Sequence, residues 1–171
     1  MAKKAASYLV GLFSGMLASS LGKYIFIFIL SLLPVLELRG GLIAASLLDM
    51  NPWSSLAVCL ISNILVIPIG LFLLEWIFDL LSKSKLLKKG IEKWKKKALS
   101  KKKTIDKYGF FGLTLFVGIP LPGTGAWTGC LLAVLLGMDK KKSFYYILAG
   151  VLMAAIIMMI FSFGILKGVI D

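Results

Sequence analysis

Histidine is absent from the 171-residue chain, and cysteine occurs only twice. The first absence excludes catalysis by an imidazole and metal sites built on histidine. Cys59 and Cys130 each stand alone in an apolar run, a spacing that fits neither a zinc site nor a redox pair. We expect both to pack as small apolar side chains. Because the sequence also offers no nucleophile–base pair and no metal-ligand cluster, we expect no enzymatic activity and no cofactor.

Acidic residues are scarce, with 8 Asp and Glu against 20 Lys and Arg and a net charge of +12. In a soluble protein this excess would indicate binding to nucleic acid. However, 59% of the residues are hydrophobic and the mean hydropathy is +0.94, which indicates an integral membrane protein. Most of the basic residues lie between Lys83 and Lys107. We therefore expect anionic lipid headgroups, and not nucleic acid, as their partner.

The apolar and charged runs divide the chain into four predicted parts. They are an N-terminal membrane or interfacial helix (1–22), a first repeat (23–82), a basic cytoplasmic amphipathic linker (83–107) and a second repeat (108–171). Two readings of the linker stay open, since it could lie on the leaflet or serve only as a solvated tether. We expect the protein in the cell (inner or plasma) membrane, crossing it several times.

The second repeat resembles the first when the chain is shifted by 88 residues, which places Pro34 on Pro122 and Gly41 on Gly129. In both repeats the order is a half-helix, a Pro/Gly break, a second half-helix, a tight turn and a full helix. Corresponding interrupted segments in two repeats are typical of the binding site of a transporter.

The lysines on both sides of Gly109–Leu136 indicate how this segment enters the membrane. Its 28 residues are too few for two crossings of about 20 residues each, so a re-entrant hairpin is favoured over the alternative of one kinked crossing. The fold class predicted is an all-α integral membrane protein with an inverted repeat and an N-terminal helix. Each half comprises a re-entrant helical hairpin (24–48 or 109–136) followed by a full transmembrane helix (54–81 or 143–166). Because irregular backbone in lipid must be covered by protein, a homodimer is a further expectation.

Glu37 and Arg39 are the only charged residues between Tyr24 and Leu48. An ionisable side chain at the centre of a membrane helix costs roughly 2.5–3.5 kcal/mol, so this pair indicates a polar site at membrane depth. Prolines and glycines around it and in the second hairpin would shape the helix breaks, namely Pro34, Gly40, Gly41, Pro120, Pro122, Gly123, Gly125 and Gly129.

The candidate site combines donors for an anion with one group that can carry a proton. Amides at the start of a half-helix attract an anion, and the planar fork of Arg39 suits a phosphate or carboxylate. Thr124, Trp127 and Thr128 could donate further hydrogen bonds. Glu37 is the carboxylate placed to take up and release a proton. The alternative is that Glu37 and Arg39 neutralise each other or cap broken helix ends, and that Trp127 is packing.

Two motifs carry a family resemblance: Glu-Leu-Arg-Gly-Gly at 37–41 and Pro-Leu-Pro-Gly-Thr-Gly-Ala-Trp-Thr-Gly at 120–129. They resemble the two signatures of the small multi-drug export protein family, a branch of the DedA superfamily of membrane proteins. The resemblance implies paired re-entrant hairpins. It also implies a superfamily whose better-known branches are proton-dependent and recycle lipid carriers such as undecaprenyl phosphate. The second hairpin departs from the core DedA pattern, because it lacks that pattern's arginines.

The sequence therefore predicts a membrane transporter with a midplane site between two hairpins and membrane lipids as partners. The favoured hypothesis is proton-linked translocation of an anionic lipid phosphate such as undecaprenyl phosphate. A second hypothesis is proton-coupled export of small cationic drugs at Glu37. A third is uncoupled lipid scrambling, or a purely structural role.

Overall fold

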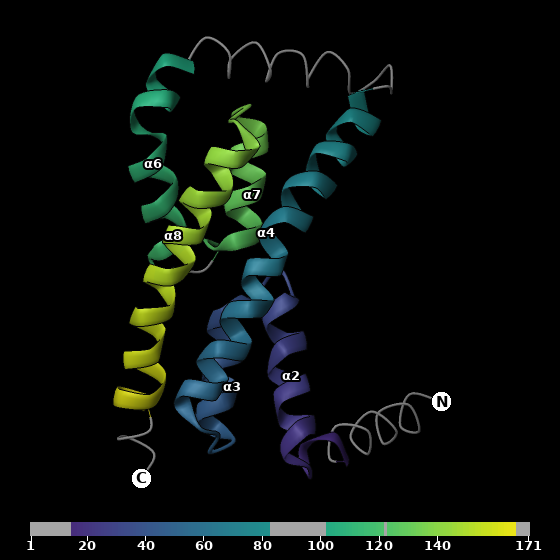
Figure 1. The fold of residues 1–171 in the computed structure, drawn as a ribbon, viewed down its shortest axis with the longest axis vertical. Coiled ribbons are helices and arrows are strands. Elements are labelled where there is room, and N and C mark those ends of the chain that lie inside the picture. Colours follow the sequence, from purple (N-terminus) through teal and green to yellow (C-terminus); the bar gives the residue numbers. More distant parts are fainter. Residues whose placement is uncertain (1–14, 83–101, 122, 167–171) are drawn as a thin grey trace.

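The computed structural model describes residues 15–82, 102–121 and 123–166, which are helical apart from short turns and breaks (Figure 1). No strand occurs in these ranges. The elements are α2 (Ser20–Leu32), α3 (Glu37–Leu47), α4 (Pro52–Ser82), α6 (Lys102–Gly118), α7 (Ala126–Leu135), α8 (Lys140–Met159) and the π-helix η1 (Ile160–Leu166). Most of the predicted N-terminal helix and basic linker, as well as Pro122, lie outside the described residues.

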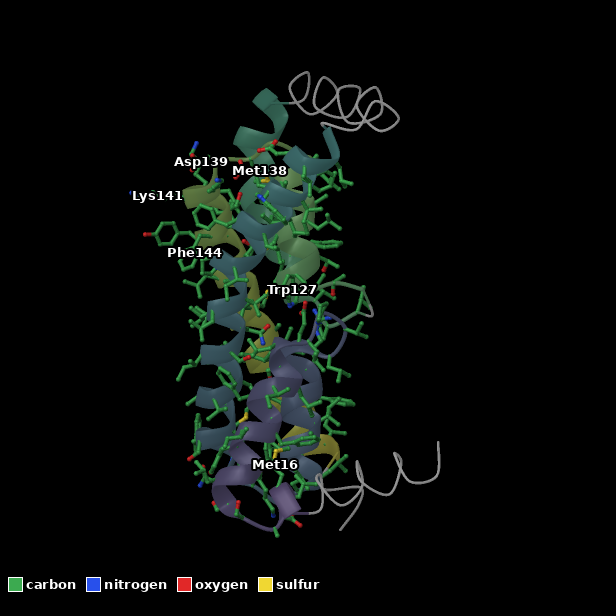
Figure 2. All side chains as sticks on the ribbon, turned by 90° about the vertical axis from the view of Figure 1, so that its right-hand side faces the viewer. Met16, Trp127, Met138, Asp139, Lys141 and Phe144 are labelled. Atoms are coloured by element: carbon green, nitrogen blue, oxygen red, sulfur yellow. The ribbon has the colours of Figure 1, made fainter. Side chains whose placement is uncertain are left out.

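Two of the helices are long and apolar enough to cross a membrane, namely Pro52–Leu81 in α4 and Lys140–Ile165 through α8 and η1. In Figure 1 the chain rises along α4 and descends along α8, and both helices lean the same way. The two helices pack against each other, and Figure 2, turned by 90°, shows that they cross near mid-height. Pro68 stands inside α4 without ending it. The molecule is thus built on a crossed pair of long helices.

The shorter helices form two pairs at opposite ends of this cross. In Figure 1, α2 rises from the lower end to mid-height and α3 returns to the lower end. Helix α6 descends from the upper end to mid-height and α7 rises again. Hence both chain breaks, the one between α2 and α3 and the one between α6 and α7, lie at mid-height. We call the part with α2 and α3 the lower half and the part with α6 and α7 the upper half.

Each break has a local cause in the sequence. Leu33 has ψ 135 and is extended, as expected for the residue before a proline. After Pro34 the chain re-enters a helix at Glu37, whose φ of 50 lies in the left-handed region. In the upper half α6 ends at Gly118, two residues before Pro120, and α7 starts after Gly125, whose φ is 139.

The same local structures recur 88 residues apart beyond the breaks. Asp49 after α3 and Gly137 after α7 both have positive φ, 51 and 61. The next helices are then capped by side-chain oxygens at equivalent positions: Asn51 Oδ1 accepts from the Trp53 amide (3.0 Å), and Asp139 Oδ1 from the Lys142 amide (2.9 Å).

Several helix boundaries differ from the predicted ones; α4, for instance, spans Pro52–Ser82 where 54–81 was predicted. Helix α2 begins at Ser20 and includes Lys23, where the predicted N-terminal helix ends, because the Ser19 hydroxyl accepts a hydrogen bond from the Gly22 amide and caps the helix. Helix α8 begins at Lys140 and not at 143, because Asp139 caps it. Helix α6 begins at Lys102, inside the predicted linker, where lysines favour helix.

Close packing between α6 and α8 holds the upper half together and depends on a glycine. A Cβ atom built on Gly150 would lie 2.6 Å from the Cβ of Val117 and 2.8 Å from the carbonyl oxygen of Thr114. Both contacts are far shorter than van der Waals distance, and one of them is to backbone, which cannot rotate away. Residue 150 therefore has to be glycine for the two helices to approach as they do.

We predict that Gly150→Ala lowers the stability of the protein by about 1–3 kcal/mol, the usual cost of overpacking. Gly112→Ala is the matched control on α6, because a Cβ there meets nothing within 4 Å. It should be neutral or stabilising by up to ~1 kcal/mol, since alanine favours helix over glycine. Thermal unfolding in detergent measures both. Equal midpoints for the two variants would contradict the packing described.

Candidate functional site

The candidate site lies where the two breaks meet, about halfway along the molecule. Figure 2 shows Trp127 at mid-height, between Met138 and Asp139 at one end and Met16 at the other. The first residues of α3 there face the end of α6 and the start of α7. The contacts between them involve one carboxylate, one guanidinium and one indole.

The Glu37 carboxylate caps α7, a helix of the other half. Its side chain is 5% exposed. Oε2 accepts a hydrogen bond from the Ala126 amide (3.1 Å) and Oε1 from the Trp127 amide (3.0 Å). These are the first two residues of α7, where amides lack partners within the helix and the helix dipole is positive. The negative charge is therefore balanced by a helix end, which reduces the cost of burying it.

The backbone at Glu37 and at its counterpart Gly125 is adapted to this contact. A φ of 50 is uncommon for a residue with a side chain and costs roughly 1–2 kcal/mol. The two amide hydrogen bonds of the carboxylate offset that cost. At Gly125 the φ is 139, and a Cβ would overlap the Glu37 carboxylate. Only glycine fits there, because the position is filled by the side chain of the other half.

The Arg39 guanidinium caps the other helix of the upper half. Its two terminal nitrogens donate to the carbonyl oxygens at the end of α6 and in the loop after it, and to one hydroxyl. The acceptors are Leu121 O and Thr124 O (both 2.7 Å), Val117 O (3.1 Å), Ile119 O (3.2 Å) and Thr124 Oγ1 (2.9 Å). Carbonyls at a helix end lack partners and carry partial negative charge. The guanidinium donors of Arg39, which were expected to bind an anion, are therefore bound to backbone carbonyls and to the Thr124 hydroxyl.

The Trp127 indole makes the reciprocal contact. Its Nε1 donates to the carbonyl oxygen of Leu32, the last residue of α2, at 2.9 Å. Trp127 is 88 residues after Arg39, so equivalent positions in the two halves each cap the first helix of the opposite pair. We call the contacts of Glu37, Arg39 and Trp127 across the two breaks the interlock.

A small cavity adjoins the interlock. Its volume is about 10 Å³, enough for one water molecule. Glu37, Arg39 and Asn63 form its polar wall, and Val151 and Ala154 of α8 are part of its apolar wall. Asn63 lies on α4 and is 1% exposed. The described residues contain no cluster of three or more His, Cys, Asp or Glu side chains that could hold a metal ion.

The structure brings most of the predicted site residues together. Glu37, Arg39, Thr124 and Trp127 all take part in contacts across the breaks. The Thr128 hydroxyl donates to the Gly125 carbonyl (3.3 Å), within the first turn of its own helix. The arrangement is the capping of helix ends, which the sequence left open as an alternative to substrate binding.

The sequence reasoning missed Asn63. Its Nδ2 donates to Ser31 O (3.1 Å) and Cys59 O (3.3 Å), which ties α4 to the end of α2. The signal was available, because Asn63 is the only asparagine in the long apolar run from Ser54 to Leu74. A buried amide in such a run indicates a polar contact between helices.

Comparison with known proteins places the chain at the level of a family. The model of a protein family described as "Putative small multi-drug export protein" matches residues 37–157. This range starts at Glu37 and includes the three side chains of the interlock, Glu37, Arg39 and Trp127. No curated protein and no solved structure shows a significant match.

We predict that Arg39→Gln lowers stability by at least about 3 kcal/mol, because hydrogen bonds to a charged group contribute about 1.5–3 kcal/mol each. The stability of Arg39→Lys should lie between that of the unchanged protein and that of Arg39→Gln, since a single ammonium cannot reach all of the same acceptors. Lys23→Gln is the control, because Lys23 Nζ caps α3 with a single bond to Leu48 O (3.1 Å) at the lower end. Thermal midpoints in detergent rank the variants. A thermal midpoint of Arg39→Gln no lower than that of Lys23→Gln would contradict the view that the interlock is the main contact between the two halves.

Proposed function

We propose that this chain, which belongs to the small multi-drug export protein family, is a proton-coupled membrane exporter whose gate is the interlock. The family name indicates export, and the two long apolar helices fit a membrane protein. One observation carries the rest of the proposal. A carboxylate, Glu37, is buried at mid-height and holds the start of α7 in the other half of the molecule.

The membrane placement we propose is an inverted repeat, with α2–α3 and α6–α7 as re-entrant hairpins from opposite faces. Helices of 13 and 11 residues, such as α2 and α3, are about 20 Å and about 16 Å long, roughly half to two thirds of the ~30 Å hydrocarbon core. The mid-height breaks and the local structures repeated after 88 residues support this placement (Figure 1). It agrees with the architecture that the resemblance to the DedA superfamily implies, in the cell membrane.

Proton binding at Glu37 would open the gate for a simple reason. An ionised carboxylate accepts both α7 amide bonds and faces the positive end of the helix dipole. A protonated carboxyl group loses the charge, and with it part of each bond. Since a hydrogen bond to a charged group contributes about 1.5–3 kcal/mol and a neutral one about 1 kcal/mol, protonation weakens the contact between the halves. A change of 1.4 kcal/mol shifts the gate equilibrium tenfold.

The substrate we favour is a small cationic drug, because Glu37 is the group at the cavity able to exchange a proton for a cation. An anionic lipid phosphate such as undecaprenyl phosphate would need Arg39 as its ligand. Arg39 would first have to leave its four carbonyl acceptors and the Thr124 hydroxyl. Uncoupled scrambling would need no acid at this position.

We predict that Glu37→Gln abolishes export driven by a pH gradient, with a loss of at least ~10-fold, because glutamine keeps the shape but cannot exchange a proton. The assay is uptake of ethidium by proteoliposomes with an imposed pH gradient. Glu75→Gln is the matched control, since Glu75 pairs with Lys140 in the upper half, away from the interlock, and should retain transport.

Two outcomes would overturn this proposal in favour of the alternatives. Equal ethidium transport by Glu37→Gln and the unchanged protein would remove proton coupling. Absence of ethidium transport, together with movement of a fluorescent phosphate lipid that is lost in Arg39→Lys, would identify the lipid phosphate as substrate.

A further inference from the structure

Three buried hydroxyl groups make no hydrogen bond to a nitrogen or oxygen atom of the described residues: those of Ser55 and Ser162, and that of Ser31, which pairs with the Cys59 thiol. Each of these side chains is fully buried. Leaving a buried hydroxyl unsatisfied is costly, so such groups in proteins are nearly always paired with protein or with ordered water. Ordered water is the partner that would satisfy the Ser55 and Ser162 hydroxyls.

All three hydroxyls lie in the lower half. Ser31 is on α2 just before the break, Ser55 is in the first turn of α4, and Ser162 is in η1 at the lower end of the α8 helix (Figure 1). The backbone of Ser162 also takes part in a polar contact, because the Ser46 hydroxyl of α3 donates to Ser162 O at 2.5 Å. The polar groups therefore extend from the lower end of the molecule toward the site.

These groups connect to the Glu37 cavity through Asn63. Its amide bonds to Ser31 O at 3.1 Å, and Asn63 itself lines the cavity beside Glu37. The Ser31 hydroxyl and the Cys59 thiol both lie against Gly41, where a Cβ would be 2.1 Å from one and 2.7 Å from the other. A row of polar side chains on α2 and α4 thus leads from the cavity into the lower half.

The upper half has no such row at the equivalent positions. Eighty-eight residues on, Ser31 corresponds to Ile119, Cys59 to Ile147, Ser62 to Gly150 and Asn63 to Val151. Ser55 corresponds to Ser143, whose hydroxyl is satisfied by Asp139 O at 2.8 Å.

The groups that face Glu37 are few. The charged or titratable ones are Arg39 on its own helix and the Cys130 thiol on α7. Helix α4 faces it with Asn63, and α8 with Val151 and Ala154. Within the part of the chain that the structure describes, α6, α7 and α8 contribute only Val117, Ala126, Val151 and Ala154 to the cavity lining, and these side chains are apolar.

We propose that Ser31, Ser55 and Asn63 line a water-filled path that reaches Glu37 from the lower end only. Waters bound to these groups would form a chain able to carry a proton to and from the carboxylate. The use of this path for coupling rests on the proposed function, whereas its hydration does not.

Cysteine modification tests the path in the full chain, reconstituted in lipid nanodiscs. Cys130→Ala leaves Cys59 as the only thiol, beside Ser31 on the proposed path. The matched control is Ile147→Cys in a chain with Cys59→Ala and Cys130→Ala, because Ile147 is equally buried and occupies the position equivalent to Cys59. The probe is 2-aminoethyl methanethiosulfonate, a small water-soluble reagent, and mass spectrometry follows the modified fraction over time.

We expect Cys59 to react at least ~10-fold faster than the control thiol, and Ser31→Val or Asn63→Leu in the Cys59 chain to slow the reaction by a similar factor. Equal rates at the two positions, or a Cys59 rate unchanged by both substitutions, would overturn the path. The second comparison needs only the native thiol, so it holds even if Ile147→Cys does not fold.

The labelling result is independent of transport. Slow labelling of Cys59 with transport still lost in Glu37→Gln would reject the path and leave the exporter standing. Fast labelling of Cys59 with transport insensitive to Glu37→Gln would support the path and reject proton coupling at Glu37.

Discussion

The free ends of the two broken helices impose the main constraint on this molecule. Backbone amides and carbonyls without partners are costly wherever water does not reach them, and in the proposed membrane placement the breaks lie at the depth of the hydrocarbon. Each half supplies side chains for the broken helices of the other: Glu37 for the start of α7, Arg39 for the end of α6, and Trp127 for the end of α2. The crossed long helices and the close α6–α8 packing then serve to keep the two breaks opposite each other.

This constraint also explains why Glu37 and Arg39, although oppositely charged and close together, have their main contacts with backbone groups and not with each other. Each charge faces the end of a helix dipole, positive for Glu37 and negative for Arg39, and each makes hydrogen bonds to backbone there. Capping and function are therefore not competing explanations of Glu37. A carboxylate that holds a helix by its charge is a group whose protonation loosens that helix. Arg39 has no comparable switch, because a guanidinium keeps its proton.

Much of the framework could be predicted from the sequence, because its signals are local. Pro34 and Pro120 interrupt apolar runs, and a charged pair in such a run is rare enough to identify a site. The partners could not be predicted. Glu37 binds amides 89 and 90 residues away, and the need for glycine at 125 arises from a carboxylate in the other half. A single sequence does not show which residues of two distant segments come into contact. Asn63 differs, because a lone amide in an apolar run is a local signal; only its partner on α2, the Ser31 carbonyl, could not be predicted.

The two halves share a framework but differ in chemistry, and this difference can give the molecule a direction. In the proposed inverted repeat, identical halves would make the states open to either side equal in energy, because exchanging the halves would convert one into the other. Glu37 stands opposite Gly125, and Arg39 corresponds to Trp127, so the exchange is not a symmetry of this chain. The polar row of the lower half adds a second difference, because it would hydrate the carboxylate from one side. A proton would then reach Glu37 from that side, and the open state favoured by protonation would have one orientation. The asymmetry thus lies in a few side chains placed on two halves whose breaks and turns recur 88 residues apart.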